Sequence, residues 1–482
     1  MKRFISTLII LSIVGALFAQ GDYEAFRFSM TEYQGTARYM GAGGAFGATG
    51  GEFSAFNTNP AAIGLYKRSE VSFTPLLLSF SKNNSLYYGN NSYTQNPKYT
   101  VPQCGLVITS NIQNSNWRAW QFGFGYNRIM DYNNIFRANA TAHNTMMNTI
   151  IDHINGINHN YLSGDGELAW NTWMVDTIPG SPNTYGSPFS NSDINQEAIV
   201  KTSGGIDEMS ITFGGNYNDK IYIGGSIGIP ILDYTERIQY TEEATDEATI
   251  NRGIRSFETN TTHHNTSGGI NLKLGIIYQP INFFRVGAGF QTPTYYWKVK
   301  DSYTRDMTSF YSNGNKSDRF SYDNYYKFSL TTPLKFNVDA SFLINKRAFI
   351  SAEYEFTDYS MARLYANDYS FDSENANIVT KYGIAHTLRI GAEVNLGQKF
   401  VLRGGYNYKT SPYKLIDNQY NASAHYGSVG FGIRTKYFFF DMAYVLRFMK
   451  DSYWIYDTND NSNAVQNSNT THRIVATVGC KF

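Results

Sequence analysis

Hydrophobic and polar side chains alternate along many stretches of the chain. One stretch places single polar residues between Leu334, Phe336, Val338, Ala340 and Phe342. Alternation with a period of two puts one set of side chains on each face of a β-strand. Such stretches predict about fourteen strands, each near the ~9–11 residues that a tilted strand needs to cross a bilayer. The expected spans are 69–80, 101–110, 117–129, 206–217, 220–231, 267–279, 282–292, 332–344, 347–357, 383–395, 398–409, 425–436, 438–449 and 471–482.

The connections between the expected strands alternate in length. Tight turns such as Asn218-Asp219 and Gly397-Gln398 alternate with long segments. Short turns at one end and long loops at the other are typical of outer-membrane barrels, with periplasmic turns and extracellular loops. A soluble β-sandwich does not place every long loop at one end. The expected extracellular loops are 81–100, 130–205, 232–266, 293–331, 358–382, 410–424 and 450–470.

The composition agrees with exposure to a membrane. Hydrophobic residues make up 42% of the 482 residues and aromatic residues 16%, but charged residues only 16%, against about 25% in soluble domains. Disordered chains are poorer in aromatic residues and richer in charge, and beyond residue 20 no apolar run approaches the ~20 residues of a spanning helix. The fold class we predict is therefore all-β, a transmembrane antiparallel β-barrel over residues 69–482 in a bacterial outer membrane.

Both ends of the chain carry features of export. Lys2 and Arg3 precede an apolar stretch, and the small residue Ala19 stands before polar residues, which is the pattern of a signal peptide. We therefore expect residues 1–20 to be removed. The last expected strand is amphipathic and ends on Phe482, which resembles the terminal signal that barrel-assembly machinery recognises. The expected partners are this machinery and the lipid bilayer, and the near balance of 40 basic and 39 acidic residues gives no reason to expect nucleic acid.

Residues 21–68 lack strand alternation and are rich in glycine and alanine. Their most distinctive positions are Gly41, Gly43, Gly44, Asn59, Pro60 and Ala61. Small residues let backbone pack against backbone, as expected of a segment folded inside a barrel lumen. A dinucleotide-binding loop is excluded, because Phe46 stands where the third glycine of that motif belongs and no strand precedes it. We expect residues 21–68 to form a plug.

The glycine-rich start, Asn59-Pro60-Ala61 and about fourteen expected strands together resemble the FadL/TodX family of outer-membrane transporters for hydrophobic compounds. The resemblance implies that residues 21–68 are a hatch plugging the lumen. It also implies passive transport of a hydrophobic molecule, such as a long-chain fatty acid or a related lipophilic compound, through an apolar pocket above the hatch.

The same resemblance assigns roles to four further residues. It implies that Phe46 and Phe56 line the pocket. It also implies that the ligand leaves sideways through a gap at the third strand, where Gly123 and Gly125 allow a kink.

Charged residues fall on the face of the expected strands that points into the lumen. They are Glu208, Lys273, Arg285, Lys335, Asp339, Glu353, Glu355, Arg389, Glu393, Arg403, Arg434, Asp441, Arg447 and Arg473. Among the cations, Lys335, Arg389 and Arg403 are the candidates for holding a ligand carboxylate. The alternative is a network of salt bridges and water, which is usual in polar barrel interiors.

No catalytic residue, metal site or cofactor is predicted. His143, His153, His159, His263 and His264 all fall in expected loops at spacings that match no compact ligand set, so we interpret them as solvated loop residues. Two other functions stay open. One is a structural or secretion-associated barrel that uses the 130–205 loop to bind protein partners, and the other is an outer-membrane enzyme, whose catalytic geometry spacing does not exclude.

Overall fold

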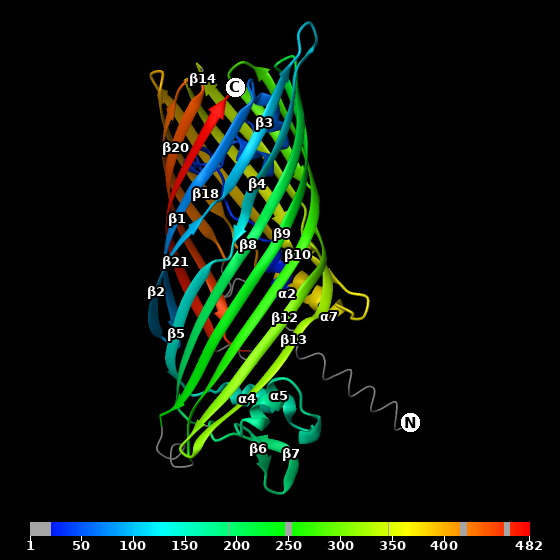
Figure 1. Ribbon diagram of the computed structural model, residues 1–482, viewed down its shortest axis with the longest axis vertical. Coiled ribbons are helices and arrows are strands. Elements are labelled where there is room, and N and C mark those ends of the chain that lie inside the picture. Colours follow the sequence, from blue (N-terminus) through cyan, green and yellow to red (C-terminus); the bar gives the residue numbers. More distant parts are fainter. Residues whose placement is uncertain (1–20, 191, 246–252, 346, 415–421, 457–462) are drawn as a thin grey trace.

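Fourteen antiparallel strands form a closed barrel in the part of the chain that the computed structural model describes, which is residues 21–190, 192–245, 253–345, 347–414, 422–456 and 463–482. The expected signal peptide lies outside these residues. Strands that follow each other in the chain pair with each other, and β21 pairs with β1 to close the barrel (Figure 1). The predicted fold class is confirmed.

Ten of the fourteen strands are continuous. They are β1 (Glu70–Tyr87), β8 (Ile194–Tyr217), β9 (Ile221–Ala244), β10 (Ile254–Ile281), β15 (Ala348–Asp358), β17 (Ile384–Leu396), β18 (Phe400–Lys409), β19 (Ala424–Arg434), β20 (Phe438–Trp454) and β21 (Ala464–Lys481). The others are each interrupted once and consist of β2 (Asn90–Thr100) with β3 (Gln103–Asn111), β4 (Trp117–Asp131) with β5 (Asn134–Ala142), β11 (Phe284–Gln291) with β12 (Tyr295–Tyr311), and β13 (Gly314–Thr331) with β14 (Lys335–Ile344).

The segments expected to be loops are largely strand. We call the end with the short turns, near the C-terminus in Figure 1, the turn end, and the opposite end the loop end. Toward the loop end β8, β9, β10, β12 and β13 continue far beyond the expected spans, so that 232–266 and 293–331 are mostly long hairpins rather than loops. Sequence reasoning missed these extensions because a strand outside the bilayer no longer needs an apolar outer face, and the alternation that marks it fades.

The 130–205 segment contains a small folded cap at the loop end (Figure 1). It includes α4 (Met146–Ile154), η4 (His159–Tyr161), α5 (Asp165–Asn171) and the hairpin of β6 (Asp176–Ile178) and β7 (Ser181–Gly186). Thr145 caps α4 by accepting a hydrogen bond from Met147 N at 3.1 Å. Segment 358–382 forms η5 (Tyr359–Met361), β16 (Arg363–Tyr365) and α7 (Asp372–Lys381). Among the described residues, no helix is long and apolar enough to cross a membrane.

The N-terminal segment lies inside the barrel. It forms α2 (Gly21–Ser29), α3 (Ala37–Gly41), η2 (Phe53–Asn57) and η3 (Pro60–Leu65). Thr36 caps α3 by accepting from Tyr39 N at 3.1 Å, and Asn59 caps η3 by accepting from Ala61 N, also at 3.1 Å. Because α3 and η3 contact strands on different sides of the wall, this segment fills the width of the lumen.

Apolar side chains fill the lumen at three levels. The cap cluster joins α4 and α5 to the strands of the loop end and contains Met147, Ile150, Leu168 and Phe257. The plug cluster surrounds α2 and contains Phe26, Phe28, Tyr132, Tyr234, Tyr296 and Tyr382. The hatch cluster, nearest the turn end, contains Tyr39, Phe46, Phe53, Phe56 and Ile63. The fourteen charged side chains expected to face the lumen are buried or half-buried, which confirms the predicted strand orientation.

Candidate functional site

The Asn59-Pro60-Ala61 motif fastens the N-terminal segment to the barrel wall. Asn59 Nδ2 donates to Asp339 Oδ2 at 3.2 Å while the same side chain caps η3. The wall makes room for the motif, since a Cβ added at Gly275 would lie 2.0 Å from Asn59 Oδ1 and one added at Gly224 would lie 2.3 Å from Pro60 O.

The hatch glycines also approach the wall closely. Gly43 has φ +64°, and a Cβ there would lie 2.7 Å from Ile390 O, so both conformation and space favour glycine. A Cβ at Gly41 would lie 3.2 Å from the Cα of Gly430 on β19. Gly44 packs on the ring of Tyr33 within the segment itself. The expected packing of backbone against backbone is present here.

Ion pairs hold the hatch as well. Glu393 accepts from Arg38 Nε of the hatch at 2.9 Å and from Arg403 Nε of β18 at 2.7 Å, and Arg403 Nη1 also donates to Asp441 at 2.7 Å. All of these side chains are buried or half-buried. Arg403, expected as a ligand-binding cation, is therefore part of the hatch anchor.

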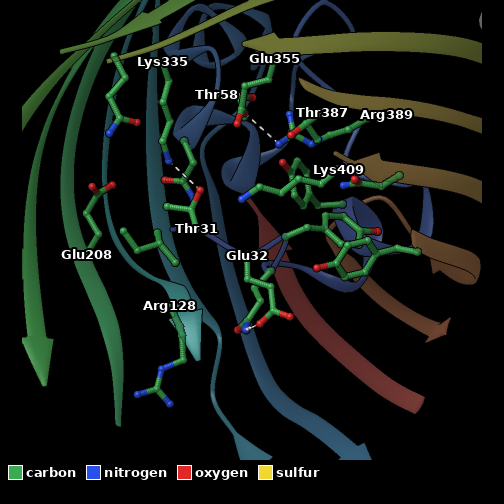
Figure 2. A pocket seen from close by; sticks show the side chains of 18 of the residues that line it. Thr31, Glu32, Thr58, Arg128, Glu208, Lys335, Glu355, Thr387, Arg389 and Lys409 are labelled. Carbon is green, nitrogen blue, oxygen red and sulfur yellow. Dashed lines mark hydrogen bonds and ion pairs between the residues drawn. The ribbon is translucent and has the colours of Figure 1, made fainter. Parts of the chain in front are cut away.

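A cavity of about 80 Å³ lies between the plug cluster and the hatch cluster (Figure 2). At ~30 Å³ per water, it has room for two or three water molecules or one small polar group. Most of its lining is polar or charged, from Thr31, Glu32, Gln34, Asn57, Thr58, Arg128, Glu208, Lys273, Gln291, Lys335, Glu355, Thr387, Arg389, Asn407 and Lys409, with Tyr33, Tyr39, Ile129 and Tyr426 completing it.

Most charges of the cavity are paired. Arg389 binds Glu353 and Glu355, the latter at 2.9 Å, and Lys273 binds Glu208. Lys335 and Lys409 differ, because within the described residues no carboxylate lies within 4.0 Å of either ammonium group. Lys335 Nζ donates to Thr31 Oγ1 at 2.7 Å, and Lys409 Nζ donates to the Tyr359 hydroxyl at 3.0 Å.

The two unpaired ammonium groups point into the same space. Figure 2 shows Lys335 and Lys409 directed into the cavity from separate parts of the wall, on β14 and β18. Glu355, which also lines the cavity and binds Arg389, acts electrostatically on both lysines from beyond ion-pair distance. Buried cations without a direct carboxylate partner favour an anionic guest. Two of the residues expected to line the pocket, Lys335 and Arg389, do line this cavity.

The cavity differs from the expected apolar pocket. Phe46 packs on Tyr39 and Phe349, with the Arg38 guanidinium 4.9 Å from its ring centre. Phe56 packs on Phe53, with ring centres 4.9 Å apart. Neither ring lines the cavity, because both are packed in the core of the hatch. The sequence motif alone does not show which other side chains these rings contact.

Gly123 and Gly125 do not mark a gap in the wall. Residues of β4 around them pair with β3 on one side and with β8 on the other. A Cβ at Gly125 would lie 2.3 Å from Phe53 Cζ, and one at Gly123 would lie 3.0 Å from Ile63 Cδ1. These glycines make room for the hatch, which corrects the expectation of a kink there.

The third barrel strand separates from the second one toward the loop end, between β5 and β2. No backbone ladder joins β2 to β5 in the residues that the structure describes. Pro97 and Pro102 lack the N–H that such a ladder uses, and the third strand is interrupted between Asp131 and Asn134. Side chains bridge this seam, as where Asn90 Nδ2 donates to Asn139 O at 2.8 Å.

His263 is not a solvated loop residue. Its side chain points into the lumen from β10 and is 4% exposed. Nδ1 lies 3.3 Å from the Glu24 carboxylate of α2, and Nε2 contacts Asp301 of β12. His143 and His153 are exposed and fit that interpretation. His264 does not, because it is half-buried on β10 with Nε2 3.3 Å from the Asp233 carboxylate. No cluster of three or more potential metal ligands occurs among the described residues.

Comparison with known proteins shows similarity at the level of structure. No family model and no curated protein matches the sequence. The Pseudomonas putida toluene transporter TodX superposes with a TM-score of 0.54 at 10% identity, covering 93% of this chain and 99% of TodX. A Pseudomonas aeruginosa FadL homologue superposes with a TM-score of 0.52 at 13% identity, covering 94% of this chain and 98% of the other.

Both matches extend over nearly the whole of each chain. Because the sequence identities are this low, the structural likeness establishes the fold alone. The chain therefore has the FadL/TodX fold, a fourteen-stranded barrel whose lumen is plugged by its own N-terminal segment.

Proposed function

We propose that the protein is a passive channel through which hydrophobic molecules with an anionic head group, such as long-chain fatty acids, cross the bacterial outer membrane. The observation that carries the proposal is the pair of unmatched ammonium groups, Lys335 and Lys409, in a cavity between two apolar clusters. The similar structures include a toluene transporter and a FadL homologue, which agrees with transport of hydrophobic compounds.

The outer surface of the barrel suits a bilayer. Exposed apolar side chains form a band around it, and on β17 they are Ile384, Leu388, Ile390, Val394 and Leu396. Burying such a band in lipid is favourable by about 25 cal/mol per Å². The bilayer is thus the proposed main partner, with barrel-assembly machinery acting during insertion.

The interior suits an amphipathic ligand. A carboxylate bound between Lys335 and Lys409 would form charge-assisted hydrogen bonds, which are roughly twice as strong as neutral ones. Ile129 lines the cavity and also packs against the plug cluster. An acyl chain extending from the cavity past Ile129 would therefore meet apolar side chains.

The seam between β2 and β5 is the proposed side exit. Met130 and Tyr132, at the junction of β4 and β5, belong to the plug cluster or pack against it, so the apolar interior reaches the seam. Opening it breaks side-chain hydrogen bonds and the ion pair of Lys98 with Asp131 at 2.9 Å, but no backbone ladder.

Uptake by liposomes tests the proposal. Liposomes containing the purified protein should take up a labelled long-chain fatty acid faster than empty liposomes, without an energy source. Deletion of residues 21–60 should abolish selectivity by unplugging the lumen. If the intact protein neither binds nor passes any hydrophobic molecule, it is not a channel of this kind.

The folded cap at the loop end favours a second candidate function, binding of a protein partner outside the cell. Tyr161 and Trp173 of the cap are 75% and 55% exposed, and large exposed aromatic side chains are common at interaction sites. Deletion of the cap would separate the two functions, since it should abolish partner binding and leave fatty-acid uptake intact. No catalytic role is proposed.

A further inference from the structure

Three tyrosine–histidine pairs lie on the outer face of the barrel. The hydroxyl of Tyr354 lies 2.6 Å from His386 Nδ1, that of Tyr406 lies 2.8 Å from His425 Nδ1, and that of Tyr444 lies 2.7 Å from His472 Nδ1. Each pair joins neighbouring strands, β15 to β17, β18 to β19 and β20 to β21.

The three histidines lie at one height on the barrel. Paired residues can be followed across the sheet from one strand to the next, as a pairing row. The row through His425 passes Tyr408 on β18 and reaches Leu388 on β17, two residues from His386. The row through His472 passes Leu446 and reaches Gly427, two residues from His425. The same offset of two residues over two strands is the stagger expected of tilted strands, so the histidines form a level row.

This row marks the loop-end rim of the apolar band. From His386 to Leu396 the chain advances ten residues, which at ~3.3 Å per residue and a tilt of ~40° is a height of about 25 Å. An apolar band in an outer-membrane barrel is about 25 Å tall. In the proposed orientation the histidines therefore lie level with the head groups of the outer leaflet.

Two lysines join this row at His472. Lys82 of β1 pairs with Thr470, diagonally next to His472, and Lys450 of β20 pairs with Ser468, further toward the loop end. Both side chains are exposed on the outer face. Within the described residues neither ammonium group has a carboxylate within 4.0 Å, and β1, β20 and β21 lie side by side (Figure 1).

The outer face around His472 also lacks acidic residues. The outward positions of β1, β2, β20 and β21 at this height, which include Leu446 opposite His472, carry no carboxylate, whereas Asp451 is on the inward face. In the tautomer in which His472 Nδ1 accepts from the Tyr444 hydroxyl, the imidazole proton is on Nε2, and the ring presents a donor to a head group.

We propose that Lys82, Lys450 and His472 form a binding site on the outer face for a phosphate of the phosphorylated glycolipid in the outer leaflet. Two cations and an N–H donor match the charge and the acceptor oxygens of a phosphate. This inference rests on the proposed outer-membrane location but not on the nature of the transported molecule.

Native mass spectrometry of the full-length protein in detergent tests the site, with bisphosphorylated lipid A as the probe and the same lipid without its phosphates for comparison. The wild-type protein should bind the phosphorylated lipid about tenfold more tightly or better. The triple variant Lys82→Gln, Lys450→Gln, His472→Gln should lose most of this preference.

Two controls make the test specific. Lys399→Gln with Lys436→Gln removes two exposed cations at the turn end, and His386→Gln removes a histidine of the row that is not flanked by Lys82 and Lys450. Both should keep the preference. Altered migration on boiling shows that each variant is folded, and the single variant Lys450→Gln replaces the triple one if that fails to fold.

Equal binding of both lipids by the wild-type protein, or equal loss in the turn-end control, would overturn the inference. Fatty-acid uptake distinguishes this result from failure of the proposed function. A protein that transports but ignores the phosphates disproves only the lipid site, whereas a protein that binds the phosphates but transports nothing disproves only the channel.

Discussion

His263 of β10 and Glu24 of α2 form a buried contact, with Nδ1 3.3 Å from the carboxylate oxygen. Gly268, five residues along β10, pairs with the exposed Trp297, and the outward apolar residues of β10 begin only at Ile270. The contact is therefore beyond the apolar band. It connects the N-terminal helix to the wall at the level of the plug cluster.

This contact predicts that docking of α2 depends on pH. Burial raises the pKa of Glu24 to about 7, against the opposing effect of His263. Burial alone would lower the pKa of His263, but Glu24 and Asp301 outweigh it and raise the pKa to about 9. Arg27 and Glu236 also face the pair. Both groups hold protons more tightly when docked than when unfolded, where the values are ~4.3 and ~6.5.

Their contribution is thus fully present at low pH and is lost as the pH rises through about 7 and then about 9. Hydrogen exchange, corrected for its intrinsic pH dependence, should show less protection of α2 at pH 10 than at pH 6. Above pH 7, where Glu24 is charged, His263→Gln should weaken docking by about 3–5 kcal/mol, because it leaves a buried carboxylate without its partner. The half-buried neighbour on the opposite face of β10 provides the control, His264→Gln, and unchanged protection across this pH range would contradict the prediction.

Replacing Gly125 with alanine, which adds only one methyl group, should already destabilise the packing of the hatch. Gly125→Ala places a methyl group 2.3 Å from Phe53 Cζ of the hatch and 2.5 Å from Cys104 O of β3, so both the hatch and the neighbouring strand must shift, at a cost of about 1–3 kcal/mol. Gly427→Ala is the matched control, since nothing lies within 4 Å of a Cβ there. We expect the first variant to lose heat-resistant gel migration at a lower temperature and to conduct more ions in planar bilayers. Equal behaviour of the two variants would show that the hatch does not depend on this contact.

The unpaired lysines should select for charge. Lys335→Met with Lys409→Met should reduce binding of a long-chain fatty acid by about tenfold or more, since each charge-assisted hydrogen bond contributes about 1.5–3 kcal/mol. Binding of the corresponding uncharged alcohol should change little. Isothermal titration with both ligands measures the difference, and Lys298→Met at an exposed position of β12 serves as the control. A parallel loss for acid and alcohol would mean that the lysines only maintain the cavity.

The strands could be predicted because lipid imposes an apolar outer face, and Leu334 to Phe342 display it plainly. Beyond the bilayer that constraint ends, which explains why the extensions of β9 and β10 were missed. His263 was still within reach of sequence reasoning, because continuing the alternation from Asn271 and Lys273 places it on the inward face. The positions of Phe46 and Phe56 could not be predicted. Whether these rings line the cavity or pack in the hatch core depends on their contacts with Phe349 and Phe53, which no local sequence pattern encodes.

The seam between β2 and β5 is the last testable feature. Ser92 Oγ donates to Asn139 Oδ1 across it, so Ser92→Cys with Asn139→Cys, in a background with Cys104→Ala and Cys480→Ala, should allow a disulfide that locks the seam. Ser81→Cys with Thr471→Cys is the matched control, because these side chains are 3.0 Å apart across the regular ladder of β1 and β21. If the seam is the exit, oxidation should slow fatty-acid uptake by liposomes severalfold in the first pair only, and reduction should restore it. Uptake that continues unchanged through a locked seam would place the exit elsewhere.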